Sequence, residues 1–252
     1  MTTNQITVSV ENLAPENGQP IAPIWFGLHD GSFDMFDEGN PASAGIEVMA
    51  EDGFTGDPQE RTPPDFLADL FAAGANPALL PSPNKTIAGE FAASSAGQNG
   101  GYQDLVLFDR RQDPFFGSQF PGKTASSTFV LNADPNQNRF LSYAGMIAAT
   151  NDGFIGNDDP EAIELFDADG NFIGADFIVY GSDVWDAGTE INDEDPINVP
   201  YNLENLFSSV DENGVVIRHP GLNPSGTGGI VDVEFDGKRI AENADFSAPD
   251  YP

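Results

Sequence analysis

The chain has 252 residues, and its 41 Asp and Glu against 9 Lys and Arg give a formal net charge of −32. Such a charge argues against nucleic acid and anionic membranes as partners, because binding them needs a positive surface, and it fits either adaptation to salt or cation binding. The absence of cysteine excludes disulfides, thiol catalysis and zinc–thiolate sites.

The first part of the chain predicts two strands and two short helices. Residues 6–10 (ITVSV) alternate β-branched and polar side chains, and residues 24–28 (IWFGL) form an apolar run, so both predict strands. Asn40 followed by Pro41 is a typical helix start, which predicts a helix over 41–51. Residues 64–73 place apolar side chains at helical spacing and predict a second helix.

From residue 100 onward the pattern returns to strands. Six segments are rich in apolar and β-branched residues: 104–108, 127–131, 140–149, 161–166, 172–179 and 229–235. Asp169-Gly170 is a hairpin turn signal between the fourth and fifth of them. Small residues make 92–101 and 223–229 resemble linkers, but no repeat divides the chain. We therefore expect one domain over 1–252, with a core over 5–235 and an extended C-terminal tail over 241–252.

The sequence contains no apolar stretch long enough for a transmembrane helix. Its first residues (MTTNQI) have neither a basic segment nor an apolar run, so no signal peptide is visible. A mature form, export by a route that does not read the N-terminus, and an intracellular protein all stay open.

Three acidic clusters are candidate cation sites, because calcium takes roughly six to eight oxygen ligands. Residues 151–159 (NDGFIGNDD) follow an apolar run, which would place them at the rim of a sheet. In residues 183–190 (DVWDAGTE), Asp186 and Glu190 are separated by Ala-Gly-Thr. Residues 167–171 (DADGN) begin like an EF-hand, but Ile178 stands where that motif has its glutamate. On composition alone, each cluster is better explained as a solvated turn.

Two of these clusters carry a resemblance to a known family. Residues 146–156 (MIAATNDGFIG) followed by 185–190 (WDAGTE) resemble the paired signature motifs of spondin N-terminal domains, most closely the bacterial branch. Four further segments resemble other parts of that pattern: 29–36 (HDGSFDMF), 39–43 (GNPAS), 213–216 (NGVV) and 219–221 (HPG). The resemblance therefore spans nearly the whole chain.

This resemblance implies an all-β fold: an antiparallel β-sandwich of the calcium-dependent membrane-binding-domain type, with one or two short helices in long loops and one Ca2+ at a loop end. Carried over position by position, the metal ligands are Asp152, Asp186 and Glu190. Animal members have aspartate at the last position, so the longer glutamate favours bidentate ligation. They bind matrix through disulfide-stabilised, partly basic surfaces, which this chain lacks, so glycosaminoglycan binding is not carried over.

Catalysis would have to use one of two histidines, His29 and His219. His29-Asp30 near Ser32 could act as a base and its orienting acid, but no nucleophile motif accompanies them. His219 lies in His-Pro-Gly, which is typical of a rigid turn. We expect a non-catalytic protein, with a hydrolase using His29 as the least favoured alternative.

The aromatic residues Trp25 and Trp185 are expected in the core. Phe115, Phe116 and Phe120 lie among Pro and Gly, so an exposed aromatic loop over 115–120 is an alternative to core packing for them.

Two functions stay open at the level of sequence. The first is a calcium-binding adhesion or matrix module, secreted or on the cell surface, whose partner is another surface protein or a polysaccharide. The second is a self-assembling subunit of a surface layer or filament, in which edges or termini pair between copies and calcium lies at the joints.

Overall fold

The computed structural model describes residues 4–59, 71–72, 74–107, 119–131, 133–148, 150–195, 199, 209–235, 238–239, 241–248 and 251. The strands within these ranges are β1 (Asn4–Glu11), β2 (Ile24–His29), β3 (Tyr102–Val106), β4 (Thr124–Leu131), β5 (Phe140–Met146), β6 (Gly153–Gly156), β7 (Trp185–Asp186), β8 (Ile217–Arg218), β9 (Glu234–Phe235) and β10 (Lys238–Arg239). The helices are α1 (Ala44–Asp52), α3 (Ile87–Ala93) and α4 (Ser95–Gln98), with 3-10 turns η1 (Pro83–Lys85), η3 (Gly181–Asp183) and η5 (Ile230–Asp232). No helix among the described residues is long and apolar enough to cross a membrane.

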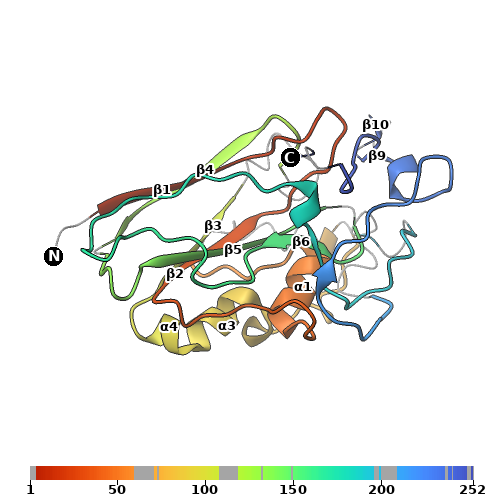
Figure 1. The fold of residues 1–252 in the computed structure, drawn as a ribbon. Coiled ribbons are helices and arrows are strands. Elements are labelled where there is room, and N and C mark those ends of the chain that lie inside the picture. Colours follow the sequence, from red (N-terminus) through yellow and green to blue (C-terminus); the bar gives the residue numbers. More distant parts are fainter. Residues whose placement is uncertain are drawn as a thin grey trace.

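Two antiparallel sheets face each other (Figure 1). The larger sheet has six strands in the order β3-β2-β5-β6-β7-β8, and the smaller is a ribbon of β1 and β4. The ribbon lies over one face of the larger sheet, and α1, α3 and α4 lie against the other (Figure 1). The prediction of an all-β, sandwich-like fold with short helices is therefore confirmed.

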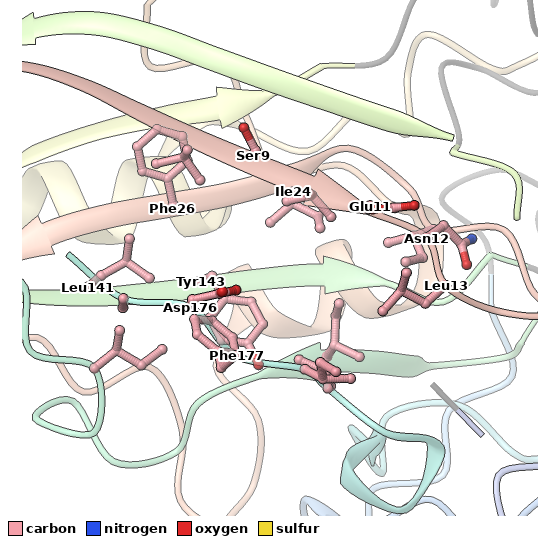
Figure 2. Close-up of a pocket in the computed structure, with 18 of the residues that line it drawn as sticks. Ser9, Glu11, Asn12, Leu13, Ile24, Phe26, Leu141, Tyr143, Asp176 and Phe177 are labelled. Carbon is pink, nitrogen blue, oxygen red and sulfur yellow. The ribbon is translucent and has the colours of Figure 1, made fainter. Parts of the chain in front are cut away.

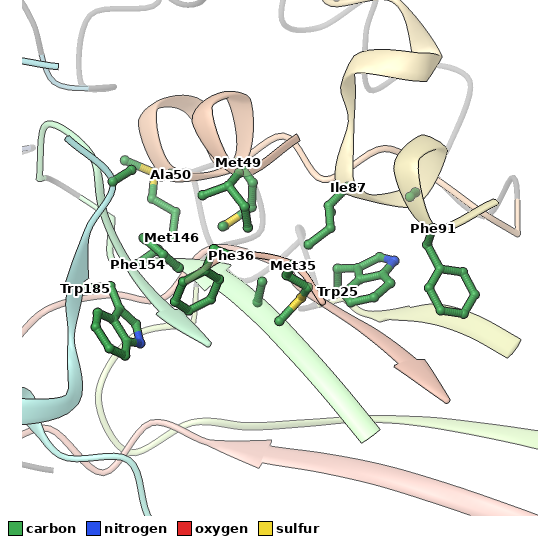
Figure 3. Packing of buried hydrophobic residues seen from close by; sticks show 14 of the residues in the cluster. Trp25, Met35, Phe36, Met49, Ala50, Ile87, Phe91, Met146, Phe154 and Trp185 are labelled. Carbon is green, nitrogen blue, oxygen red and sulfur yellow. The ribbon is translucent and has the colours of Figure 1, made fainter. Parts of the chain in front are cut away.

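Two hydrophobic clusters lie on the two faces of the larger sheet. Strand β5 contributes to both, because successive side chains of a strand point to opposite faces: Leu141 packs toward the ribbon, while Ala144 and Met146 pack toward the helices. On the helix side, Trp25 and Trp185 are 0% and 1% exposed, which confirms their expected place in the core (Figure 3).

Helix α1 confirms the first predicted helix but begins later than expected. Its N-cap is Ser43, whose hydroxyl accepts a hydrogen bond from the Ile46 amide (3.2 Å), not Asn40. The Glu90 carboxylate of α3 also accepts hydrogen bonds from the Ser43 hydroxyl (2.7 Å) and the Gly45 amide (2.8 Å). The start of α1 is thus set by a contact between two helices. The second predicted helix, over 64–73, falls almost wholly outside the described residues.

The predicted strands over 161–166 and 172–179 are wrong. These segments form only isolated bridges, Phe140 with Glu164 and Phe166 with Phe172. Strand β6 pairs only with Ala144–Met146 of β5, so Glu164 can bridge Phe140 on the same edge, but this pairing does not extend into a ladder. The turn between them does form, with Gly170 in the left-handed region (φ 79°).

Three further boundaries differ from the predictions. Residues 230–232 of the predicted strand over 229–235 form the 3-10 turn η5, and only its last two residues form β9. The linker-like stretch 92–101 contains the end of α3 and all of α4, because Ser94 caps α4 through its hydroxyl and the Gly97 amide (3.1 Å). Strand β6 begins inside the acidic cluster 151–159, since Gly153 and Phe154 pair with β7.

The C-terminal segment, expected as an extended tail, packs against the domain. Phe246 and Tyr251 belong to the cluster between the sheets, with 4% and 8% exposure. The Gly181 amide donates to the Tyr251 carbonyl (2.7 Å), and the Gln19 amide donates to the Tyr251 hydroxyl (3.1 Å). Burial of these two rings explains the docking. Of the three aromatic residues in the segment 115–120, only Phe120 is described, and it is half-buried against a small third cluster.

Candidate metal centre

The two acidic motifs lie side by side because their strands pair. Strand β6 is antiparallel to β7, with Gly153 opposite Asp186. Directly before this pair, the Ala187 amide donates to the Asp152 carbonyl (3.2 Å). The chain turns after Gly188, which is left-handed (φ 66°) and packs so closely on Val215 that no Cβ fits. This turn brings the residues after β7 back over Asp152.

Asp152 is fully buried, and only one of its two carboxylate oxygens has hydrogen-bond partners. Its Oδ2 accepts hydrogen bonds from the Thr189 amide (2.8 Å), the Glu190 amide (3.1 Å) and the Thr189 hydroxyl (3.3 Å). Its Oδ1 is buried and has no hydrogen-bond partner. A buried carboxylate oxygen without a partner is costly, so the position favours a bound cation or a proton.

Two glutamates share this environment. Glu190 is 1% exposed, and its Oε1 also lacks a partner. Glu51, in the last turn of α1, likewise buries an unpartnered Oε1. No ion pair within the described part of the chain reaches either glutamate or Asp152. Three carboxylates therefore each present one buried oxygen with no protein group to satisfy it.

The pKa values of the three carboxyls are raised, and burial is the main cause in each case. Burial, then the charge of Asp186, raises the pKa of Asp152 to about 6. Burial, then the charges of Glu51, Asp152 and Asp52, raises the pKa of Glu190 to about 9. Burial also raises the pKa of Glu51 to about 7, although hydrogen bonds from Thr189 and Ser209 oppose it. A cation placed among these carboxylates would lower all three.

Asp186 stands apart from the two glutamates. It is 2% exposed, its Oδ1 accepts from the Gly188 amide (2.8 Å), and its Oδ2 accepts from the Asn192 side chain. Its charge acts on Asp152 and on His219. Asp152 thus accepts a hydrogen bond from the Glu190 amide and is affected by the charge of Asp186, and Glu51 is the acid whose charge raises the pKa of Glu190 most.

The donor set suits a hard cation. All candidate ligands are carboxylate oxygens, and calcium prefers oxygen ligands in flexible geometry. Among the described residues, no group of three or more acidic or imidazole side chains is close enough together to hold a metal ion as the structure stands. Binding would therefore require these carboxylates to move closer to one another.

In the EF-hand-like turn over 167–171, unlike at Asp152 and Glu190, both carboxylate oxygens of the first aspartate have hydrogen-bond partners. Asp167 Oδ1 accepts from the Asp169 amide (3.0 Å) and the Asn171 amide (2.8 Å), and both of its oxygens contact the Asn171 side chain. These hydrogen bonds, chiefly those from Asn171, lower the pKa of this exposed carboxyl. The carboxylate closes its own turn, as expected of a solvated loop.

The two histidines lie in separate places, and His29 is buried whereas His219 is half-buried. His29 Nδ1 accepts from the Gly31 amide (3.0 Å), so in the neutral ring Nε2 carries the proton and donates to the Ser142 hydroxyl (2.9 Å). Asp30 instead accepts from the Ser32 amide (3.0 Å) and hydroxyl (2.5 Å). The adjacent residues proposed as a base and its orienting acid are therefore bonded to other partners. His219 Nε2 is buried without a partner.

Sequence reasoning missed Glu51. The predicted helix over 41–51 includes Glu51, but nothing in the local sequence sets this residue apart from the other acids. A comparison with models of known protein families finds no match, and a comparison with curated proteins finds none of significant similarity. The resemblance to spondin domains thus rests on the motifs quoted above and stays a prediction.

Proposed function

We propose that this protein is a non-catalytic, calcium-stabilised adhesion or matrix module that acts outside the cell. Its calcium ion would lie between the loop at Asp152 and the loop over 186–190, as in the spondin domains that its motifs resemble. The observation that carries the proposal is the set of three buried, unpartnered carboxylate oxygens on Asp152, Glu190 and Glu51.

Calcium would have a structural role here, because one ion would be bound by several segments of the fold at once. Asp152, Glu190 and Glu51 would each offer their unpartnered oxygen, and Asp186 would bind through lone pairs that its two hydrogen bonds leave open. One ion would then link α1, the start of β6 and the loop after β7. In a chain without cysteine, such a link takes the place that disulfides hold in other extracellular modules.

A calcium-titrated thermal melt, together with metal analysis of the purified protein, tests the proposal. Ligand binding to the folded state alone stabilises it by about 2.7 kcal/mol when the free ion is at 100 times its Kd. For a chain of this size that corresponds to a rise of roughly 5–10 °C in Tm. Magnesium should be the weaker substitute, because it gives up its waters reluctantly.

The assignment of Asp186 is tested separately with Asp186→Ala. A smaller rise in Tm with calcium is expected, because one ligand is lost. An unchanged calcium response in this variant would remove Asp186 from the ligand set, and no rise at all in the native chain would sink the metal proposal.

A second candidate function is a self-assembling subunit with calcium at the joints. The observation in its favour is that, among the described residues, the six-stranded sheet ends in β8, where Ile217 is 43% exposed. An edge strand can pair with another chain. Size-exclusion chromatography with and without calcium separates the two candidates. A monomer under both conditions would leave only the adhesion module.

A further inference from the structure

A cavity of about 410 Å3 lies over one face of the six-stranded sheet. Figure 2 shows β1 along one side of it and the segment that carries Asp176 and Phe177 along the other. Its floor is formed by alternate residues of two neighbouring strands: Ile24, Phe26 and Leu28 from β2, and Leu141 and Tyr143 from β5. Because alternate residues of a strand share one face, the floor is a single, mostly apolar face of this sheet.

The two side walls are lined differently from the floor. Every residue over 6–11 lines the cavity, and so does every residue over 174–181. A cavity beneath one face of an extended chain would touch only every second residue, because successive side chains point to opposite faces. Consecutive residues border the same space where the edge of the chain, with its amides and carbonyls, faces it. The cavity is therefore a slot between two backbone edges.

Both backbone edges lack a strand partner on the side of the slot. Within the described part of the chain, residues 175–179 make no backbone hydrogen bond, although they run without a turn or bend. Strand β1 pairs there with β4 alone, and its one further backbone contact is the Val10 carbonyl, which accepts from the Gln119 side chain (2.9 Å). A row of unpaired amides and carbonyls is a template for another strand, and here two such rows border one slot.

Exposure and charge indicate what kind of strand would fit. Phe177 and Ile178 line the slot and are each 50% exposed, and clustered apolar side chains of this kind mark binding sites more often than inert surface. The only charged residues of the lining are Glu11 and Asp176, and both are acidic and exposed. A second copy of the chain would bring its own net charge of −32, so repulsion disfavours self-pairing and favours a partner with basic side chains.

We propose that this slot binds one extended segment of a partner protein, which inserts as a strand between β1 and residues 174–180. The segment would be about five or six residues long, the usual length of a strand. Its backbone would hydrogen-bond to both edges, and its alternate side chains would be apolar where they rest on Phe26 and Leu141. The side chains between them would be polar or basic beside Glu11 and Asp176.

This inference rests on the proposed adhesion function, since it names the chemistry of the partner. It does not use the metal ligands, because α1, which carries Glu51, lies against the other face of the six-stranded sheet (Figure 1). A test of the slot in calcium and in chelator therefore keeps the two apart. Loss of the calcium response and loss of partner binding would be separate results.

The full chain is titrated in both media with a fluorescently labelled peptide, Thr-Val-Lys-Val-Lys-Val-Thr, blocked at both ends. The matched control is the same peptide N-methylated at its valines, which keeps the charge and the side chains but removes the amide hydrogens along one edge of the strand. The methylated peptide should bind at least roughly tenfold more weakly. Equal affinities would overturn the proposal, because charge or apolar contact alone would then explain the binding.

Hydrogen exchange locates the bound peptide. Amides over 6–11 and 175–179 should exchange more slowly when the peptide is present, whereas those of the turn over 167–171 should not change. Protection of neither wall would overturn the proposal. Protection of both walls that rises with protein concentration in the absence of peptide would also overturn it, because the slot would then belong to a second copy of the chain.

Proline substitutions test the wall that is not a strand. Ala175→Pro/Ile178→Pro removes one amide from each of the two alternating sets, and neither amide has a partner in the free protein, so the variant should fold and bind the peptide at least roughly tenfold more weakly. Ala168→Pro is the control. Its turn is closed by the Gly170 amide and the Asp167 carbonyl (2.9 Å), a position that favours proline, so binding should be unchanged.

Unchanged binding in the double variant would overturn the proposal. If the double variant failed to fold, the comparison of the native and methylated peptides on the native chain would still decide the matter.

Discussion

Two acidic segments of this chain look alike in sequence and differ completely in the fold. The turn over 167–171 and the loops around Asp152 and Glu190 both combine acids with glycine and asparagine. Asp167 is exposed and uses its oxygens to close its own turn. Asp152 and Glu190 are buried, and each leaves one oxygen with no partner.

This difference shows that acidic composition alone does not locate a cation site. An exposed carboxylate that accepts hydrogen bonds from its own loop is satisfied and has no need of an ion. A buried carboxylate with an unpartnered oxygen and acidic neighbours is destabilising until a proton or a cation neutralises it. The four predictions below test this comparison.

The largest contrast is expected between Asp152→Asn and Asp167→Asn. Asp152→Asn should abolish the calcium-dependent rise in Tm, yet in chelator it should be at least as stable as the native chain at neutral pH, because it removes a buried charge. Asp167→Asn should respond to calcium like the native chain. Paired melts check this, and a full calcium response in Asp152→Asn would contradict the assignment.

The second prediction concerns pH. Burial and neighbouring acids raise the folded-state pKa of Glu190 to about 9, above its ordinary value of 4.5. The folded state therefore binds more protons than the unfolded state, so in chelator stability should fall as pH rises toward 9. Calcium displaces these protons, so its apparent affinity should rise over the same window.

Melts between pH 7.5 and 9 isolate this effect, because the histidines act only at lower pH. Burial lowers the pKa of His29 and of His219 to about 4, so their contribution to stability is lost only as pH falls from 6.5 through 4. A calcium affinity that is flat from pH 7.5 to 9 would rule out Glu190 as a ligand.

A smaller effect is expected for Glu51, which local sequence reasoning does not single out. Glu51→Gln should weaken calcium binding by roughly tenfold, or about 1.4 kcal/mol, since one carboxylate is lost while the others remain. Glu38→Gln, an exposed acid before α1, is the matched control and should leave affinity unchanged. Isothermal titration measures both, and equal affinities would place Glu51 outside the site.

The smallest effect is expected for Asp167→Ala. This change removes the hydrogen bonds that close the turn, so Tm should fall slightly, and by the same amount with and without calcium. A fall that appears only in calcium would show that the turn also binds the ion, and would erase the contrast between the two segments.

Local sequence patterns correctly predicted three elements. Alternation over 6–10 and the apolar run over 24–28 became β1 and β2, and the helix near residue 46 became α1. Patterns failed for 161–166 and 172–179, which have strand composition but form only isolated bridges, one of them between Glu164 and Phe140 of β5. The composition of a segment shows that it can form a strand, but whether it does so depends on the strands available for it to pair with.

The candidate metal site was likewise predictable only in part. The motif resemblance selected Asp152, Asp186 and Glu190, and the pairing of β6 with β7 brings their two loops together. Glu51 was not predictable, because only the packing of α1 against the sheet points its side chain at Glu190. His29 and Asp30 are neighbours in sequence, which suggested that their side chains interact. In the structure Asp30 accepts hydrogen bonds from Ser32 instead.

The pairing of β1 with β4 has a consequence for how the domain opens. Among the described residues, β1 is hydrogen-bonded to one strand only, β4, whereas β2 and β5 are each bonded to a strand on both edges. The ribbon should therefore detach before the central strands do, and amide hydrogens in β1 and β4 should exchange with solvent sooner than those in β2 and β5. Each such opening exposes the apolar cluster between the sheets, which includes Phe26 and Leu141, so the least stable unit of the fold would also be the one that shields this cluster from water.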